Sequence, residues 1–285
     1  MSDTEGGHTL GLDSIFPEPP APPIPDPTTS TYVREETPIN GEGRSPVDDE
    51  DRSSSTWSSI NIRLVGSHPL WGHHLWNASR AFATYLDEHA ELYKYRHVLE
   101  LGAGGGLPGI VACKNGARTV VLTDYPDADL LENLSYNVKT NTVSTSASNF
   151  CVKGYIWGQP VGPLLDALPS PAKSIGFDLV IMSDLIFNHS QHDALLRACD
   201  HSLARPQYLQ AADSSGLTMP PPCLLVFYTH HRPHLAHRDM EFFSKARAYG
   251  WHCEEILTRK FPPMFPEDPG DEEVRGTVHG WKLTR

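Results

Sequence analysis

Residues 98–109 read V-L-E-L-G-A-G-G-G-L-P-G, a short apolar run followed at once by a glycine-rich turn. The apolar run predicts a buried strand, and the chain after Gly106 predicts the start of a helix with Pro108 in its first turn. Residues without a Cβ let the backbone turn sharply and bring its N–H groups close to a ligand. A strand, a glycine turn and a helix in this order predict a cofactor site of the nucleotide type.

The rest of the folded chain alternates between strand-like and helix-like segments. Strands are predicted near residues 60–65, 98–101, 119–123, 150–152, 177–182, 224–229, 252–260 and 277–283, and helices near 73–89, 107–113, 127–141, 189–204 and 234–249. This alternation is typical of an α/β protein with a doubly wound parallel sheet and helices on both faces. Because no helix separates the last two strands, we expect them to pair antiparallel as a hairpin at one edge.

The N-terminal segment differs from the rest in composition. Residues 1–56 contain nine prolines, the acidic run D-D-E-D at 48–51 and few large apolar residues, and they hold −9 of the formal net charge of −12. Such a segment buries too little apolar surface to offset its ordering entropy. We therefore predict a disordered, acidic, Pro-rich tail over residues 1–56 and one folded domain over residues 57–285, with a surface insertion at 205–222.

Composition also narrows the range of partners. An acidic chain without a basic stripe argues against nucleic acid held by phosphate contacts. The five cysteines are scattered, as expected in a reducing compartment, and neither a membrane span nor a secretory signal is indicated, so we expect a cytoplasmic protein. The histidines at 230, 231, 234 and 237 lack zinc-like spacing and partners, so no metal is predicted.

The glycine turn by itself is compatible with either of two cofactors, a nicotinamide dinucleotide or S-adenosylmethionine. Gly104, Gly106 and Gly109 match the dinucleotide pattern G-x-G-x-x-G, and Asp124 ends the next strand where a ribose-binding carboxylate belongs. Three features favour S-adenosylmethionine over a nicotinamide dinucleotide. Glu100 precedes the first glycine by two residues, where a carboxylate meets the methionine ammonium but would repel a pyrophosphate. The dinucleotide pattern also starts late, and a closing antiparallel hairpin is expected of methyltransferases.

Several motifs, taken in order, resemble those of one family. E-L-G-A-G-G-G-L-P-G (100–109), T-D-Y-P-D (123–127), W-G (157–158) and F-D-L-V-I-M-S-D-L-I-F-N-H (177–189) resemble seven-β-strand S-adenosylmethionine-dependent methyltransferases. Within these they are similar to protein lysine methyltransferases that modify translation factors and chaperones. With L-W-G-H-H-L-W-N-A (70–78), the chain resembles a fungal subgroup that methylates the N-terminus and adjacent lysine of elongation factor 1-alpha, earlier grouped under nicotinamide N-methyltransferase.

The resemblance covers about residues 64–285 and implies a Rossmann-like, seven-stranded sheet, S-adenosyl-L-methionine as cofactor and a protein substrate. By position, the main chain of residues 102–104 would hold the methionine end of the donor, Asp124 the ribose hydroxyls, and Trp157 the adenine, by stacking. The alternatives are that Asp124 caps the next helix, that Trp76 is a core residue of an amphipathic helix, and that Trp157 packs under the Pro-rich loop. The implied cofactor residues, besides Glu100, are Trp76, Gly102, Ala103, Gly104, Asp124, Trp157 and Ser183.

Catalysis is predicted in the loop after the strand at 177–182. Asp184 and Phe187 resemble the family's D-x-x-(Tyr/Phe) element, which holds the target amine. Methyl transfer to an amine is an in-line displacement that needs a neutral nitrogen, so positioning and desolvation dominate. Asp184 would accept a hydrogen bond from the amine, and Phe187 would supply an aromatic wall that tolerates the growing positive charge. Alternatively, Asp184 caps the following helix and Phe187 belongs to the core.

The sequence therefore predicts a protein N-methyltransferase. A main-chain α-amine has a pKa near about 7.7–8.0, against about 10.4 for lysine, so it loses its proton more easily at neutral pH. Three other readings remain open: a small-molecule, nicotinamide-like N-methyltransferase, an NAD-dependent oxidoreductase and a catalytically silent binding module.

Overall fold

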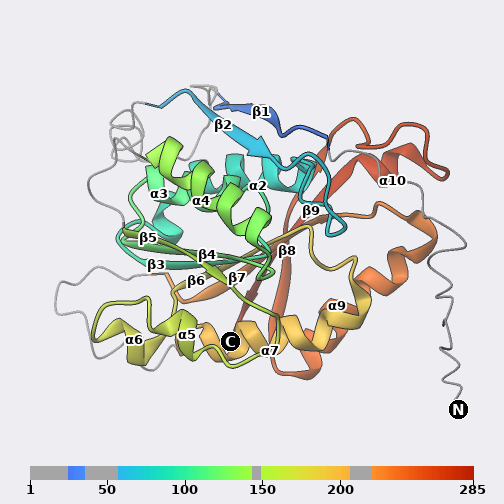
Figure 1. The fold of residues 1–285 in the computed structure, drawn as a ribbon. Helices are drawn as coiled ribbons and strands as arrows, with labels where there is room; N and C mark the ends of the chain where they lie inside the picture. Colours follow the sequence, from blue (N-terminus) through green and yellow to red (C-terminus); the bar gives the residue numbers. More distant parts are fainter. Residues whose placement is uncertain (1–24, 36–56, 143–148, 206–219) are drawn as a thin grey trace, which may run out of the picture.

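A computed structural model describes residues 25–35, 57–142, 149–205 and 220–285. Its centre is a seven-stranded sheet with the strand order β5-β4-β3-β6-β7-β9-β8 (Figure 1). The strands are β3 (His97–Leu101), β4 (Thr119–Asp124), β5 (Asn149–Gly154), β6 (Leu179–Ser183), β7 (Cys223–Thr229), β8 (His252–Lys260) and β9 (Thr277–Thr284). The first five pair in parallel, which confirms the predicted doubly wound sheet.

The C-terminal strands confirm the predicted edge hairpin and add one detail. β8 and β9 pair antiparallel, but β9 lies between β7 and β8 and pairs antiparallel with both. Because β7 is completely buried, whereas β8 is largely exposed, the outermost position suits the more polar strand. The mixed sheet therefore ends in β9 and then β8.

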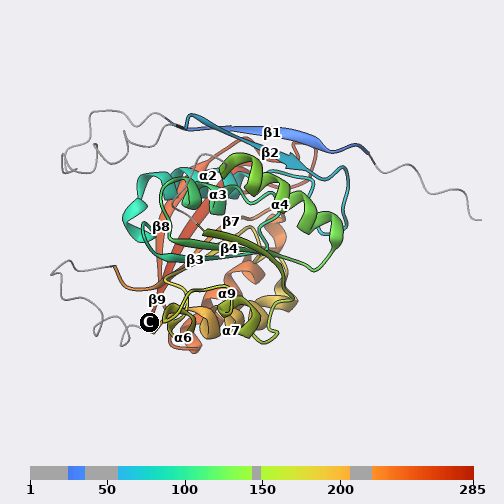
Figure 2. The same ribbon diagram turned by 60° about the vertical axis from the view of Figure 1, so that its left-hand side comes forward.

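Two helical layers cover the sheet (Figures 1 and 2). One face carries α2 (Asn77–Glu88), α3 (Leu107–Lys114) and α4 (Ala128–Thr142), and a buried apolar cluster fills the space beneath them. The opposite face carries α7 (His192–Ser202) and α9 (Ala236–Ala248), with a second apolar cluster that includes Phe177 and Phe242. Shorter helical segments are η2 (Ala90–Leu92), α5 (Gly162–Leu165), α6 (Ala172–Ile175), η3 (His189–Gln191), η4 (Pro233–Leu235) and α10 (Glu272–Gly276).

A strand lies inside the segment predicted to be a disordered tail. β1 (Thr28–Val33) pairs antiparallel with β2 (Ser59–Leu64) in a separate two-stranded sheet above α4. Tyr32 is buried against the helical layer, and Arg34 forms a bidentate ion pair with the buried Asp87 of α2, at 2.8 and 2.9 Å. The folded part of the chain therefore includes residues 25–35, which corrects the boundary predicted at residue 57; residues 1–24 and 36–56 lie outside the described part.

Asparagines of α4 hold β2 in place. Asn137 is fully buried, accepts the Arg63 N–H at 2.8 Å, and donates to the Arg63 carbonyl at 2.8 Å and to the Gly105 carbonyl at 3.1 Å. Asn133 also donates to the Arg63 carbonyl at 2.8 Å, and Asn141 donates to the Asn61 carbonyl at 2.9 Å. Residues i, i+4 and i+8 lie on one face of a helix, so these three side chains together supply the β2 backbone with hydrogen-bond partners that a neighbouring strand would otherwise provide.

Several predicted boundaries shift by a few residues. α2 begins at Asn77 rather than His73, and β6 begins at Leu179 rather than Phe177. The predicted helices near 189–204 and 234–249 each begin with a 3₁₀ turn, η3 and η4. Residues 206–219, most of the predicted insertion, lie outside the described residues. None of the helices in the described residues has the length and apolarity needed to cross a membrane.

Candidate active site

A cavity of about 600 Å³ opens at the carboxyl ends of the parallel strands. Loops after β3, β4 and β6 supply its walls, as does the segment before α2, which matches the crevice expected of a doubly wound sheet. Every predicted site residue except Glu100 lines this one cavity: Trp76, Gly102, Ala103, Gly104, Asp124, Trp157, Ser183, Asp184 and Phe187.

The turn between β3 and α3 depends on glycine. Gly102 and Gly104 have φ values of +58° and +53°, which disfavour a residue with a side chain. A Cβ at Gly102 would approach a Leu185 methyl group to 2.6 Å, whereas the corresponding position at Gly104 has no atom within 4 Å among the described residues. Gly102 therefore satisfies a packing requirement, and Gly104 leaves open space on the cavity side of the turn.

Asp124 joins the end of β4 to this turn. Its Oδ2 accepts the Gly104 N–H at 2.7 Å, and its Oδ1 accepts the Tyr125 N–H at 2.7 Å. Burial raises the pKa of Asp124, although both backbone N–H groups act in the opposite direction. The alternative of a helix cap does not hold, because Asp127 caps α4 by accepting the N–H groups of Asp129 and Leu130.

Glu100 lies beneath the turn and not in the cavity. The residue has no exposed surface, and its Oε2 accepts the Gly109 N–H at 2.9 Å. Burial raises its pKa to about 8, so the carboxyl is mainly protonated at pH 7. The predicted contact with a methionine ammonium is therefore contradicted: burial keeps Glu100 from the ligand side and removes its charge.

The same contact explains the last glycine of the dinucleotide-like pattern. A Cβ at Gly109 would lie 2.4 Å from Glu100 Oε2 and 2.7 Å from a Leu122 methyl group. Gly109 thus permits close packing of α3 on β3 and β4.

Two indole rings enclose the cavity from different sides. Trp157 Cζ2 would lie 3.2 Å from a Cβ at Gly102, so the ring lies against the glycine turn. Trp76 stands just before α2, with its ring centroid 4.9 Å from that of His231 and 5.9 Å from that of Phe265. Both residues line the cavity, which favours the predicted binding roles over purely structural packing.

Ser183, the last residue of β6, and Asp184, which follows it, both line the cavity. Ser183 Oγ is buried and has no hydrogen-bond partner among the described residues, as expected of a group that meets a ligand. Asp184 has a φ of +57°, a backbone conformation that a non-glycine residue rarely adopts. Its Oδ1 accepts the Thr229 N–H at 3.3 Å, and its Oδ2 lies 2.9 Å from His231 Nε2. The carboxylate therefore does not cap the following helical segment.

Sequence reasoning missed two features of the cavity. Four large apolar side chains at its mouth are about half exposed: Leu70, Trp71, Tyr125 and Ile156. The second feature is the contact of His231 with Asp184. The paired histidines at 230 and 231 were the available signal, but the carboxylate partner of His231 lies 47 residues away in sequence. Within the described residues, no group of three or more His, Cys, Asp or Glu side chains is arranged so that it could hold a metal ion.

The residues present fit a ligand that combines an amino acid with an adenosine. The open turn at Gly104 leaves room for the amino-acid end, and Ser183 offers an unpaired hydroxyl. Asp124 provides a carboxylate at the end of β4, and Trp157 provides a flat apolar face.

The family match and two relatives support this assignment, and one solved structure is reported for comparison. The family described as lysine methyltransferase matches residues 60–211. Protein N-terminal and lysine N-methyltransferase EFM7 of Cryptococcus neoformans is 46% identical over an alignment of 288 positions that covers 100% of this chain and 91% of that protein. The protein of the same name from Candida glabrata is 40% identical over an alignment of 287 positions that covers 100% of this chain and 99% of that protein. A solved structure of Pyrococcus horikoshii TYW2 with MeSAdo aligns with 79% of this chain and 68% of its own, at 15% identity and a TM-score of 0.45.

The sheet, its cavity and the family match define an S-adenosylmethionine-dependent methyltransferase. The alternative of an NAD-dependent oxidoreductase is thereby rejected. The chain belongs to the lysine methyltransferase family and, within it, to the EFM7 group of protein N-terminal and lysine N-methyltransferases.

Proposed function

We propose that this enzyme methylates the N-terminal amine and the adjacent lysine of elongation factor 1-alpha in the cytoplasm. The relatives' names specify protein N-terminal and lysine N-methylation, and the motifs at 70–78 and 177–189 resemble the subgroup that acts on this factor. The observation that supports an amine substrate most directly is the pairing of Asp184 and Phe187 on one wall of the cavity, next to the turn proposed to hold the donor.

The donor would occupy the part of the cavity nearest the glycine turn. The main chain at Gly102, Ala103 and Gly104 would hold its methionine end, and Asp124 would accept the ribose hydroxyls. Trp157 would stack on the adenine, Trp76 would close over the donor from the start of α2, and Ser183 Oγ would hydrogen-bond to it. When bound, S-adenosylmethionine supplies a methyl group on a positively charged sulfur.

The target amine would enter beside Asp184 and Phe187. Asp184 would accept a hydrogen bond from the nitrogen and so aim its lone pair, and Phe187 would form an apolar wall that excludes water. The ring also tolerates the positive charge that develops on the nitrogen. Since an α-amine loses its proton more readily than a lysine, the N-terminal amine is the more reactive of the two targets at neutral pH.

The proposal is tested by transfer of labelled methyl groups from S-adenosylmethionine. Purified full-length enzyme is incubated with elongation factor 1-alpha that has a free N-terminus, with the same protein acetylated at the N-terminus, and with nicotinamide. Mass spectrometry should locate the label on the N-terminal residue and the next lysine, with loss of the N-terminal label after acetylation. Labelling of nicotinamide alone would establish the small-molecule alternative, and binding of S-adenosylhomocysteine without transfer to any substrate would indicate a silent binding module.

Asp184→Asn provides the matched variant for this assay. Asparagine keeps the shape of the side chain and tolerates a positive φ, so the loop is expected to keep its conformation. Loss of the negative charge should lower the rate of methyl transfer by about 10- to 100-fold, because a hydrogen bond to a charged acceptor is replaced by a weaker one. A rate equal to that of the unsubstituted enzyme would remove Asp184 from the mechanism.

A further inference from the structure

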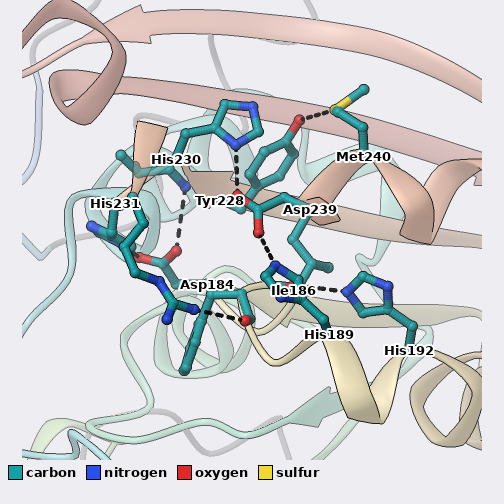
Figure 3. Close-up of polar contacts among 12 residues, drawn as sticks. Asp184, Ile186, His189, His192, Tyr228, His230, His231, Asp239 and Met240 are labelled. Carbon is teal, nitrogen blue, oxygen red and sulfur yellow. Dashed lines mark hydrogen bonds and ion pairs between the residues drawn. The ribbon is translucent and has the colours of Figure 1, made fainter. Parts of the chain in front are cut away.

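Histidines gather around the loop that holds Asp184 (Figure 3). His230 and His231 follow β7 directly, and each lies against a different carboxylate. His230 Nδ1 is 2.7 Å from Asp239 Oδ2, and the other oxygen of Asp239 is 2.7 Å from His189 Nε2. The bridge from His189 through Asp239 to His230 joins the loop after β6 to α9 and the end of β7, and so fixes the backbone on which His231 stands.

His231 makes the only side-chain contact to Asp184 among the hydrogen bonds of the described residues. His231 Nε2 and Asp184 Oδ2 are 2.9 Å apart, and the Thr229 N–H occupies Oδ1. Both oxygens are therefore held from the side of β7. Since Asp184 is 5% exposed and its backbone is in a rarely adopted conformation, the direction of this carboxylate is set by these two donors.

The surroundings of His231 contain groups of both charges. Asp184 faces it from the loop after β6, Asp239 from α9, Arg232 from its own loop and His74 from the segment before α2. The Trp76 ring packs against the imidazole. Burial lowers the pKa of His231, but the charge of Asp184 and its hydrogen bond to the ring outweigh burial, so that the pKa is raised above its usual value.

We propose that His231 is the positioning residue of the amine site: it orients Asp184 and sets the charge that the substrate amine meets. This inference rests on the proposed contact between Asp184 and the amine. With a protonated imidazole, the pair of His231 and Asp184 has no net charge; with a neutral imidazole, which still donates from Nε2, the carboxylate keeps its full charge for the amine.

The charge of the pair has a consequence for the pH dependence of the reaction. The productive encounter needs an unprotonated amine and a neutral His231, so two protons must be lost from the free reactants. The value of kcat/KM reports the ionisation of free enzyme and free substrate. At pH values below the pKa of both His231 and the amine, it should therefore be inversely proportional to the square of the proton concentration. If only the amine had to lose a proton, kcat/KM would be inversely proportional to the proton concentration itself.

His231→Gln separates these two cases in the full-length enzyme. The glutamine amide keeps an N–H donor for Asp184 but does not titrate in this range. The pH profile of this variant is measured with an N-terminal peptide of elongation factor 1-alpha between about pH 5.5 and 9.5. Below the pKa of the amine, its kcat/KM should be inversely proportional to the first power of the proton concentration. At the alkaline end the variant should keep a value within several-fold of the unsubstituted enzyme, whereas His231→Ala, which has no donor for Asp184, should lose about 10- to 100-fold there. His237→Gln, an exposed position on α9, is the matched control and should leave the profile unchanged.

Two results would overturn the proposal. One is a His231→Gln profile that keeps the square dependence, and the other is an unchanged kcat/KM in His231→Ala. Isothermal titration with S-adenosylhomocysteine at each pH shows whether the variants still fold and bind the donor.

A measurement without substrate separates this proposal from the proposed function. NMR titration of histidine-labelled enzyme, with the His231 signal assigned by its loss in His231→Gln, should give a pKa above about 6.5 that falls in Asp184→Asn. If the peptide is not methylated but this shift is found, the substrate assignment fails and the His231–Asp184 pair stands. If Asp184→Asn leaves the titration unchanged, the pair is absent in solution and the proposal fails.

Discussion

Asp124 shows how one carboxylate serves both the turn and the cavity. Its oxygens accept the N–H groups of Gly104 and Tyr125 and still face the space proposed for the ribose. We predict that Asp124→Ala weakens S-adenosylhomocysteine binding by about 10- to 100-fold, the loss expected for hydrogen bonds to a charged group. Isothermal titration measures this. The control is Asp127→Ala, which removes the cap of α4 and the contact with His68 but no group that lines the cavity, and which should bind nearly normally. Equal affinities for all three proteins would contradict the ribose role.

Glu100 should make the stability of the protein depend on pH in the direction opposite to that of most carboxylates. Its pKa is about 8 in the folded state, against a usual value of 4.5, so between these limits the folded state binds more protons than the unfolded state. The free energy of unfolding therefore decreases as pH rises through this range, by up to about 1.4 kcal/mol per pH unit from this group. Glu100→Gln, which mimics the protonated acid, should gain stability relative to the unsubstituted enzyme from about pH 5 to about pH 8. Urea unfolding at both pH values measures the difference, and a difference that does not change with pH would show that Glu100 has an ordinary pKa.

At the scale of the elements, the attachment of β2 to α4 depends on one buried side chain. Asn137 bonds to both backbone groups of Arg63 and to the Gly105 carbonyl, so Asn137→Ala would leave buried backbone groups unpaired. We predict a loss of about 2–4 kcal/mol in the free energy of unfolding. Asn141→Ala, on the same helix face but more exposed, should cost about 1 kcal/mol or less. Urea denaturation compares the two variants, and equal losses would contradict the assigned role of burial.

The elements also show where prediction from the sequence ends. The strand–turn–helix at residues 98–113 and the closing hairpin were predicted correctly because hydrophobic periodicity and glycine placement are local signals. β1 was missed, because its stability comes from pairing with β2 and from the ion pair between Arg34 and Asp87, which lie 53 residues apart in sequence. The cavity residues were found through motifs, whereas the roles of Glu100 and His231 required knowledge of burial and of distant partners. Local pattern thus predicts the elements, and long-range contacts decide the exact chemistry of the site.

For the whole molecule, we propose that the cavity divides into a donor part near β3 and β4, together with Ser183 at the end of β6, and an amine part in the loops after β6 and β7. A ligand that binds only the folded state stabilises it, by about 2.7 kcal/mol at a concentration 100 times its Kd. If the division is correct, S-adenosylhomocysteine at one fixed concentration should stabilise the unsubstituted enzyme and Asp184→Asn equally, but Asp124→Ala much less. The change in urea midpoint on addition of the ligand measures this for all three proteins. A loss of ligand stabilisation in Asp184→Asn as large as in Asp124→Ala would mean that the donor also depends on the β6 loop, and the two parts of the cavity would then act as a single binding unit.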